Sequence, residues 1–410
     1  MVAASTRALW AVAASMALGA SAVAAQSLEE VLAKQANLTT FRGLVKDYAD
    51  IFSNLPKSGV TILAPSDSAY LKGQGWDANR DDIVIGLQYG ILEGRVAFDA
   101  MYPGNSTIES TLLTDGRFSN VTGGQHVLVT KQPNSDVVVT SGVASRTTAL
   151  KTDIAFDGGL VQVIDSLMVT PARLETTARD AYQDLTAFLG ALYTAGLVAE
   201  FAETPNVTIF APRNAAFQAV AGTLSAMGAD ALRRVLRYHL VPAAVVQASL
   251  LANGTRLPTA VDGKSIDITL YNNDIFVDSA RVLQTNILVA NGVVQMLDTV
   301  LNVDAPNAEP NVTAVSQLPL FTVTGTVQTG TGAPTPFISA LPCTTNCPVS
   351  GGGGGAGGAG GTATGGVSPS SSTGGVAAAR CTGGMVGAAA GVGLGLAVGV
   401  MGMEALGVIA

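Results

Sequence analysis

An internal repeat constrains the fold of this chain more than any other feature. Residues 38–70 align without a gap to residues 185–217 at a constant offset of 147, and 10 of the 33 aligned positions are identical. The densest match pairs Val60–Pro65 (VTILAP) with Val207–Pro212 (VTIFAP). The chain therefore contains two copies of one module.

The ends of the two copies also match. Gly159–Asp165 (GLVQVID) aligns with Gly292–Asp298 (GVVQMLD) at an offset of 133, so the first copy is longer by about 14 residues in its middle. Each copy has roughly 130–145 residues, which is enough to bury its own hydrophobic core.

The hydrophobic pattern of the second copy predicts helices first and strands afterwards. Apolar residues recur at helical spacing over Asp184–Ala202 and Ala231–Leu240, whereas Val207–Phe210 is a short β-branched run. Later strands are expected at Ser265–Leu270, Ile275–Val277, Arg281–Leu283 and Val293–Leu301. Early helices and late strands indicate the α+β class.

A polar residue follows each early strand at the same place. Asn214 in the second copy and Asp67 in the first are both good N-cap residues, and we expect each to cap the helix that it begins.

Several segments carry a resemblance to a known family. They are Thr208–Phe217, Arg237–His239 with its Tyr238-His239 pair, and Asn291–Leu301, and the first copy repeats two of them at Thr61–Tyr70 and Gly159–Leu167. These segments closely resemble the signatures of fasciclin-like domains, over about residues 27–304. The resemblance implies two tandem domains, each a helical layer packed on a β-sandwich or wedge of mixed strands, followed by a disordered tail. It also implies an extracellular adhesion or matrix-interaction module that is not an enzyme.

The two copies depart from the family pattern in different places. The first copy has Tyr89-Gly90 where the second has Tyr238-His239. The Asp-Ile pair that some family members use for integrin recognition is present as Asp153-Ile154, but the second copy has Asn286-Ile287. Nothing else in the sequence supports integrin binding.

Both ends of the chain have the composition of targeting signals. Residues 1–25 combine Arg7, the apolar run Ala8–Ala20 and small residues before Gln26, which is typical of a secretory signal peptide. The apolar run Met385–Met403 follows small residues and a weak spacer, a pattern typical of a GPI-attachment signal. The best attachment candidates are Gly374 and Ser372, and a retained transmembrane helix is the alternative.

These observations give the predicted organisation of the chain. It comprises a signal peptide at 1–25, fasciclin-like domains at 26–172 and 173–304, a Pro/Gly/Ser/Thr-rich linker at 305–375 and a removed attachment signal at 376–410. The linker has a single charged residue, Glu309, and we expect it to bury no core. Cys343 and Cys347 are candidates for a small local disulfide.

Six Asn-x-Ser/Thr sequons are candidate N-glycosylation sites, as expected of a secreted chain. They are Asn37, Asn105, Asn120, Asn206, Asn253 and Asn311.

The chain offers few groups for catalysis. With two histidines and three cysteines, a multi-histidine metal site or a zinc-finger array is excluded, and no cofactor is expected. His239 lies on the apolar face of its helix, where a structural histidine is favoured over a general base, and His126 is expected on a solvent-facing strand position. Asp165 and Asp298 interrupt apolar strands, so we expect each carboxylate to accept hydrogen bonds from backbone or threonine hydroxyl groups.

The sequence favours an adhesion or matrix-interaction protein on the outer face of the plasma membrane or in the cell wall, of the fungal type. Its expected partners are surface or matrix proteins, wall glycans and, through a lipid anchor, the membrane. A net charge of −8 without a Lys/Arg cluster argues against nucleic acid. One alternative is a structural wall spacer, and another is a wall-polysaccharide-binding or -modifying enzyme.

Overall fold

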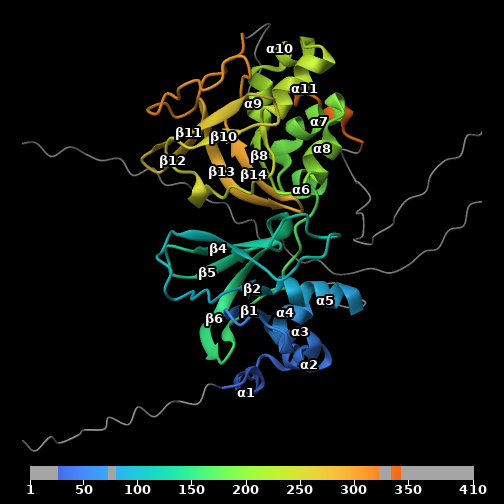
Figure 1. The fold of residues 1–410 in the computed structure, drawn as a ribbon, viewed down its shortest axis with the longest axis vertical. Coiled ribbons are helices and arrows are strands. Elements are labelled where there is room, and N and C mark those ends of the chain that lie inside the picture. The colour runs from blue at the N-terminus through green and yellow to red at the C-terminus, as the bar shows by residue number, and fades with distance from the viewer. Residues whose placement is uncertain (1–25, 73–79, 323–333, 343–410) are drawn as a thin grey trace, which may run out of the picture. The chain divides into compact units, whose positions relative to one another are not determined.

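The computed structural model describes residues 26–72, 80–322 and 334–342 (Figure 1). These residues all fall within a single compact unit of the chain. Each of the two sequence repeats forms its own set of helices and its own sheet, and the helices come mostly before the strands.

The first repeat contains five described α-helices and seven strands. The helices are α1 (Leu28–Ala33), α2 (Thr39–Asp47), α3 (Ala49–Ser53), α4 (Asp67–Lys72) and α5 (Arg80–Tyr89). The strands are β1 (Val60–Pro65), β2 (Ile91–Glu93), β3 (Ser106–Ser110), β4 (His126–Lys131), β5 (Val137–Thr140), β6 (Arg146–Phe156) and β7 (Gly159–Ile164), with a 3-10 turn, η1 (Gly142–Ala144), before β6.

The second repeat has the same plan. Its helices are α6 (Leu174–Asp180), α7 (Thr186–Ala195), α8 (Val198–Glu203), α9 (Asn214–Ala219), α10 (Ala221–Ala226) and α11 (Ala229–Arg237), with 3-10 turns η2 (Gln183–Leu185) and η3 (Ala248–Leu250). Its strands are β8 (Val207–Pro212), β9 (Leu240–Val241), β10 (Arg256–Pro258), β11 (Ser265–Tyr271), β12 (Asp274–Val277), β13 (Ala280–Val289) and β14 (Gly292–Leu297). A last 3-10 turn, η4 (Ile338–Ala340), follows them.

The two sheets have the same strand order. It runs β2-β1-β7-β6-β5-β4-β3 in the first repeat and β9-β8-β14-β13-β12-β11-β10 in the second. In each sheet the first strand pairs in parallel with the last, as β1 with β7 and β8 with β14, and every other neighbouring pair is antiparallel. The predicted α+β class with mixed strands is confirmed.

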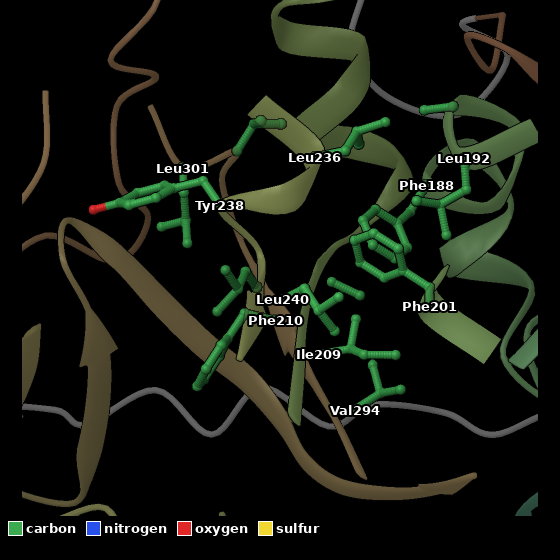
Figure 2. Packing of buried hydrophobic residues seen from close by; sticks show 14 of the residues in the cluster. Phe188, Leu192, Phe201, Ile209, Phe210, Leu236, Tyr238, Leu240, Val294 and Leu301 are labelled. Atoms are coloured by element: carbon green, nitrogen blue, oxygen red, sulfur yellow. The ribbon is translucent and has the colours of Figure 1, made fainter. Parts of the chain in front are cut away.

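Each repeat also buries its own core. One large cluster is made of residues from the second repeat and the chain after it, and two clusters are made of residues from the first repeat. Figure 2 shows the second core, where the rings of Phe188 (α7) and Phe201 (α8) meet edge to face with their centroids 5.8 Å apart. Burial of this apolar surface is the main force that holds the helices on the sheet.

Two β-bulges occur at matching positions of β6 and β13. The first leaves Leu150 without a partner residue on β7 and Leu283 without one on β14. The second brings in Asp153 and Asn286, both with positive φ, at 55° and 58°. A bulge changes the direction in which the side chains around it point. The same positions of β6 and β13 therefore depart from the alternating pattern of a regular strand.

One predicted helix is divided in two. The periodicity over Asp184–Ala202 predicted a single helix, but α7 ends at Ala195 and α8 begins at Val198. Gly196 adopts a left-handed conformation with φ 67°, and its N–H bonds back to carbonyls of the last turn. Glycine takes this conformation without steric cost and thereby ends the helix.

The predicted linker is wrong in its first part, because described residues after 304 pack on the second core. Phe321 is buried in this core, and Phe337 and Leu341 lie against it. The Phe337 and Phe217 rings meet edge to face at 6.1 Å. These few large apolar side chains, spread through a polar stretch, supply enough contact to hold the segment on the helices.

A glycine at the parallel pair gives a test of this architecture. A Cβ atom at Gly159 would lie 1.8 Å from the Val60 carbonyl oxygen, whereas a Cβ at Gly43 in α2 would meet nothing within 4 Å. We expect Gly159→Ala to lower the free energy of unfolding of the first domain by at least about 1–3 kcal/mol. Gly43→Ala is the matched control and should stabilise by about 0.5–1 kcal/mol. Chemical denaturation of both variants measures this, and equal stabilities would contradict the packing.

Candidate functional site

A buried polar network occupies the same place in both domains. The Gln162 side-chain oxygen accepts a hydrogen bond from the Asp153 N–H at 2.7 Å, and its nitrogen donates to the Val96 carbonyl at 3.1 Å. Gln295 makes the matching bonds, to the Asn286 N–H at 2.8 Å and to the Val246 carbonyl at 3.1 Å. Gln162 on β7 thereby connects the second bulge of β6 to the loop after β2. Gln295 on β14 connects the second bulge of β13 to the loop after β9 in the same way.

A threonine on the first strand completes this network. The Thr61 hydroxyl donates to the Gly94 carbonyl at 2.9 Å and accepts from the Val96 N–H at 2.7 Å. Thr208 does the same with Ala244 at 2.8 Å and Val246 at 2.7 Å. Sequence reasoning missed these threonine and glutamine roles, although their identity in both copies was a usable signal.

The Asp-Ile pair is part of this network. The Asp153 carboxylate accepts from the backbone N–H groups of Phe98 and Asp99 at 3.0 and 2.9 Å, and from the Gln162 side chain at 2.7 Å. Asn286 replaces it in the second domain, where its oxygen accepts from the Ala248 N–H at 2.9 Å. An amide suffices because this position needs an acceptor and not a charge. The carboxylate of Asp153 is therefore engaged in internal structure.

Asp165 and Asp298 close the end of the β6–β7 and β13–β14 pairs. Asp165 accepts from the Thr148 N–H at 2.9 Å and the Thr147 hydroxyl at 3.0 Å. Asp298 accepts from the Arg281 N–H at 2.8 Å and, with its other oxygen, from the Gln317 N–H at 2.9 Å. The prediction that these carboxylates accept hydrogen bonds from backbone and threonine groups is confirmed.

The two carboxyl groups differ in their surroundings. Burial raises the pKa of Asp298 above its ordinary value, and the hydrogen bonds from Gln317 and Arg281 offset this only in part. Burial acts in the same direction on Asp165, but there the bonds from Thr148, Thr147 and Ser166 outweigh it and the pKa is lowered. Both groups are held by main chain or hydroxyl donors, which fits a role in structure.

Asp67 and Asn214 both cap a helix, but not the helix that each begins, so the prediction is wrong about which helix is capped. The Asp67 carboxylate accepts from the Thr39 and Thr40 N–H groups at 3.1 and 2.8 Å, at the start of α2. The Asn214 oxygen likewise accepts from the Ala187 N–H at 2.8 Å, in the first turn of α7. Each residue caps a helix 27 or 28 positions earlier in the sequence, because the first turn of that helix packs beside the end of the first strand.

Tyr238 and its counterpart Tyr89 connect a helix end to a later strand. The Tyr89 hydroxyl donates to the carbonyl of His126, the first residue of β4, at 2.9 Å. The Tyr238 hydroxyl bonds the carbonyl of Ser265, the first residue of β11, at 2.9 Å, and the Asp278 carboxyl group at 2.7 Å. Burial raises the pKa of Asp278.

His239 is fully buried, and its bonds fix its tautomer. Its Nε2 accepts from the Leu301 N–H at 3.0 Å, so the proton must sit on Nδ1, which donates to the Val235 carbonyl at 2.9 Å. Burial lowers the pKa of His239 to about 4, although the Val235 carbonyl opposes this shift. The lone pair that a general base needs is already in use, which confirms the prediction of a structural histidine.

The prediction for His126 is wrong, because only 7% of this residue is exposed. It begins β4 and pairs with Ser110, on the face of the strand that the alternation predicted to be open. Burial lowers the pKa of His126. This burial comes from tertiary packing, which the alternation of a single strand does not predict.

The described residues hold no group of three or more His, Cys, Asp or Glu side chains that could bind a metal ion. Within the same ranges, no helix has the length and apolar character needed to cross a bilayer. Three sequence predictions lie outside the described residues: the signal peptide, the disulfide candidates Cys343 and Cys347, and the attachment candidates Ser372 and Gly374. Residues 323–333 and 343–375 of the predicted linker also lie outside them.

The six sequons differ in how their amide nitrogens are used. The Asn120 Nδ2 donates to the Glu203 carbonyl at 2.7 Å, and the Asn206 Nδ2 donates to the Thr122 hydroxyl at 2.9 Å. Both bonds join residues of different repeats. The Nδ2 atoms of the remaining sequons donate no hydrogen bond to another described residue; these are Asn37, Asn105, Asn253 and Asn311.

Comparison with known families settles what these shared features mean. The model of the Fasciclin domain matches residues 36–170 and 183–303. The chain belongs to the fasciclin domain family. The paired threonine, glutamine and aspartate contacts above are thus the internal frame of two fasciclin domains in tandem.

Several known proteins are similar to this chain. A fasciclin-like arabinogalactan protein of Arthroderma benhamiae is 28% identical over 75% of this chain and 73% of its own length. The fasciclin-like arabinogalactan protein elcF of Phaeosphaeria nodorum is 28% identical over 68% and 89%, respectively. Human periostin is 24% identical over 61% of this chain and 29% of its own length. A solved fasciclin domain pair from the insect cell adhesion molecule Fasciclin I covers 65% of this chain with 17% identity and a TM-score of 0.32.

The buried histidine predicts a pH dependence. An unfolded chain protonates His239 near pH 6.5, whereas the folded domain does so only near pH 4. The unfolded state therefore binds the extra proton first, and the stability that this group contributes is lost as the pH falls from 6.5 to 4, by about 3 kcal/mol. We expect His239→Phe to be less stable than the wild type at pH 7.5 and to approach it at pH 4.5. Calorimetry of both proteins across this range measures the difference, and parallel curves would refute the assignment.

The sequons give a second test. N-glycans attach to Nδ2, so a glycan on Asn120 or Asn206 removes the hydrogen bond that this atom donates and places a sugar between packed segments. We expect the secreted, folded protein to carry little or no glycan at these two positions and to carry its glycans at the other four. Enzymatic deglycosylation in ¹⁸O-labelled water followed by peptide mass spectrometry measures the occupancy of each. Full occupancy of Asn120 in monomeric folded protein is the contrary result.

Proposed function

We propose that this fasciclin-domain protein acts outside the cell in adhesion or matrix interaction, through weak contacts made by both domains at once. Because the polar motif residues are engaged internally, the contacts must come from the outer surface. The partners we propose are surface or matrix proteins, or glycans of a cell wall.

One surface feature carries this proposal. The first bulge of β6 and of β13 exposes a leucine at the same position in both domains, with 55% of Leu150 and 41% of Leu283 accessible to solvent. A single exposed leucine needs no explanation. The same exposed leucine at the same bulge of both domains indicates a contact point that both domains use.

Repetition of a weak contact is what adhesion requires. One exposed side chain gives little affinity, but two contact points on one chain raise the apparent affinity by about 10²–10⁴ when both engage the same surface. Many chains in one membrane increase this further. The predicted lipid anchor at Gly374 or Ser372, with the predicted signal peptide, completes the proposal by holding the domains at the outer face of the membrane.

Attachment of cells that display the full chain tests the proposal. We expect Leu150→Ser or Leu283→Ser alone to reduce attachment to surfaces coated with wall glycans or with the same cells by at least about tenfold, and the double variant to abolish it. Leu318→Ser is the matched control, since Leu318 is 85% exposed and has no counterpart in the first domain.

The same cells test the anchor. Treatment with a phosphatidylinositol-specific phospholipase should release the protein from the cells, and the treated cells should no longer attach to the coated surface. Unchanged attachment of the double leucine variant would favour a wall spacer without adhesive faces. Retention of the chain after treatment would favour a transmembrane helix.

A further inference from the structure

The two domains differ at the position of the buried histidine. The Leu63 N–H donates to the Gly90 carbonyl at 2.8 Å, and the Phe210 N–H donates to the His239 carbonyl at 2.9 Å. These matching bonds place Gly90 and His239 at the same point of the fold. The first domain therefore has the backbone of this site without its ring.

In the second domain the imidazole ring fills the space between the helices and the end of the sheet. It lies 6.3 Å from the Phe188 ring, centroid to centroid, and bonds the Val235 carbonyl and the Leu301 N–H. The second domain thus shows what kind of group fits this place: a flat ring with an acceptor atom aimed at a backbone N–H.

The first domain has a cavity of about 310 Å³ here. Its lining includes Phe41, Gly86 and Met168, which are the counterparts of Phe188, Val235 and Leu301, and Gly90 itself. The walls are mostly apolar, with the carboxyl-bearing Asp82 among the few polar residues. Its size is at the lower end of the range for small-molecule sites.

One backbone N–H group in this cavity wall has no hydrogen-bond acceptor among the described residues. The Leu301 N–H is satisfied by His239 in the second domain, but the N–H of its counterpart Met168 donates to no other described residue. Met168 is half-buried and belongs to the cavity lining, which places this N–H at the wall of the cavity. A ligand that brings an acceptor atom would take over the role of the histidine nitrogen.

The cavity does not collapse, because its frame is fixed from outside. The Tyr89 hydroxyl holds the end of α5 to β4, and the Gly90 backbone is bonded both to β1 and to the last turn of α5. These are the bonds that hold the histidine site together in the second domain, so the frame keeps its shape without the ring.

We propose that this cavity, bounded by Phe41, Gly86, Gly90 and Met168, binds a small planar apolar molecule with one hydrogen-bond acceptor. Roughly 10–15 non-hydrogen atoms fit the volume. The acceptor bonds the Met168 N–H and the flat body packs against Phe41. This activity is separate from adhesion, since the cavity lies inside the first domain and shares no residue with the exposed bulge leucines.

Quinoline and indole are suitable probes, because both are flat, soluble bicyclic molecules and only quinoline offers a ring nitrogen as acceptor. We expect quinoline to bind the full chain and to raise the unfolding temperature of the first domain. Indole should bind about fivefold more weakly, the effect of one hydrogen bond. Gly90→His should weaken quinoline binding at least tenfold, because its ring occupies the space.

Two further measurements keep the proposal testable if Gly90→His folds poorly. In wild-type protein with ¹³C-labelled methionine methyl groups, quinoline should shift the Met168 signal and leave that of Met296 in the second domain unchanged. His239→Gly should create a second quinoline site, in the other domain. No Met168 shift with millimolar quinoline, or equal binding by wild type and a folded Gly90→His variant, overturns the proposal.

Discussion

The parallel pairing of the first strand with the last is the interaction on which each domain depends. It joins β1 to β7 and β8 to β14, and so brings the two ends of a module of more than 100 residues into one sheet. The pairing is close enough that only glycine fits at its start, at Gly159 and Gly292, against the carbonyls of Val60 and Val207. The antiparallel strands and helices α4, α5 and α9–α11 lie between the paired strands in sequence, whereas α1–α3 and α6–α8 precede them. The pairing fixes the frame on which both groups of helices pack.

The polar residues of the family signatures support this pair. Threonine on the first strand and glutamine on the last bind the loop between them, and the second bulge supplies an aspartate or asparagine to the same network. Buried polar groups of this kind are costly unless all are satisfied, so a complete network selects one arrangement of the chain. The residues that most resemble a reactive site are therefore engaged in the internal structure of each domain.

The two copies share a frame but are not equivalent. The second domain fills its histidine site and covers Gly190 of α7 with the chain around Phe337, where a Cβ would lie 2.3 Å from the Phe337 carbonyl oxygen. The first domain has glycine in place of the histidine, and Gly43, the counterpart of Gly190, has open space around it. The two copies thus keep one frame, with the histidine site filled in the second domain and unfilled in the first.

The sequence by itself determined the repeat, the α+β class, the family and the need of Asp165 and Asp298 for hydrogen-bond donors, because these follow from identity between the copies and from local periodicity. It did not determine which helix Asp67 and Asn214 cap, the burial of His126 or the docking of Phe321 and Phe337. Each of these depends on segments that are far apart in the chain and become neighbours only when the sheet closes. Hydrophobic pattern specifies that a face is buried, whereas the partner that buries it is decided by tertiary packing.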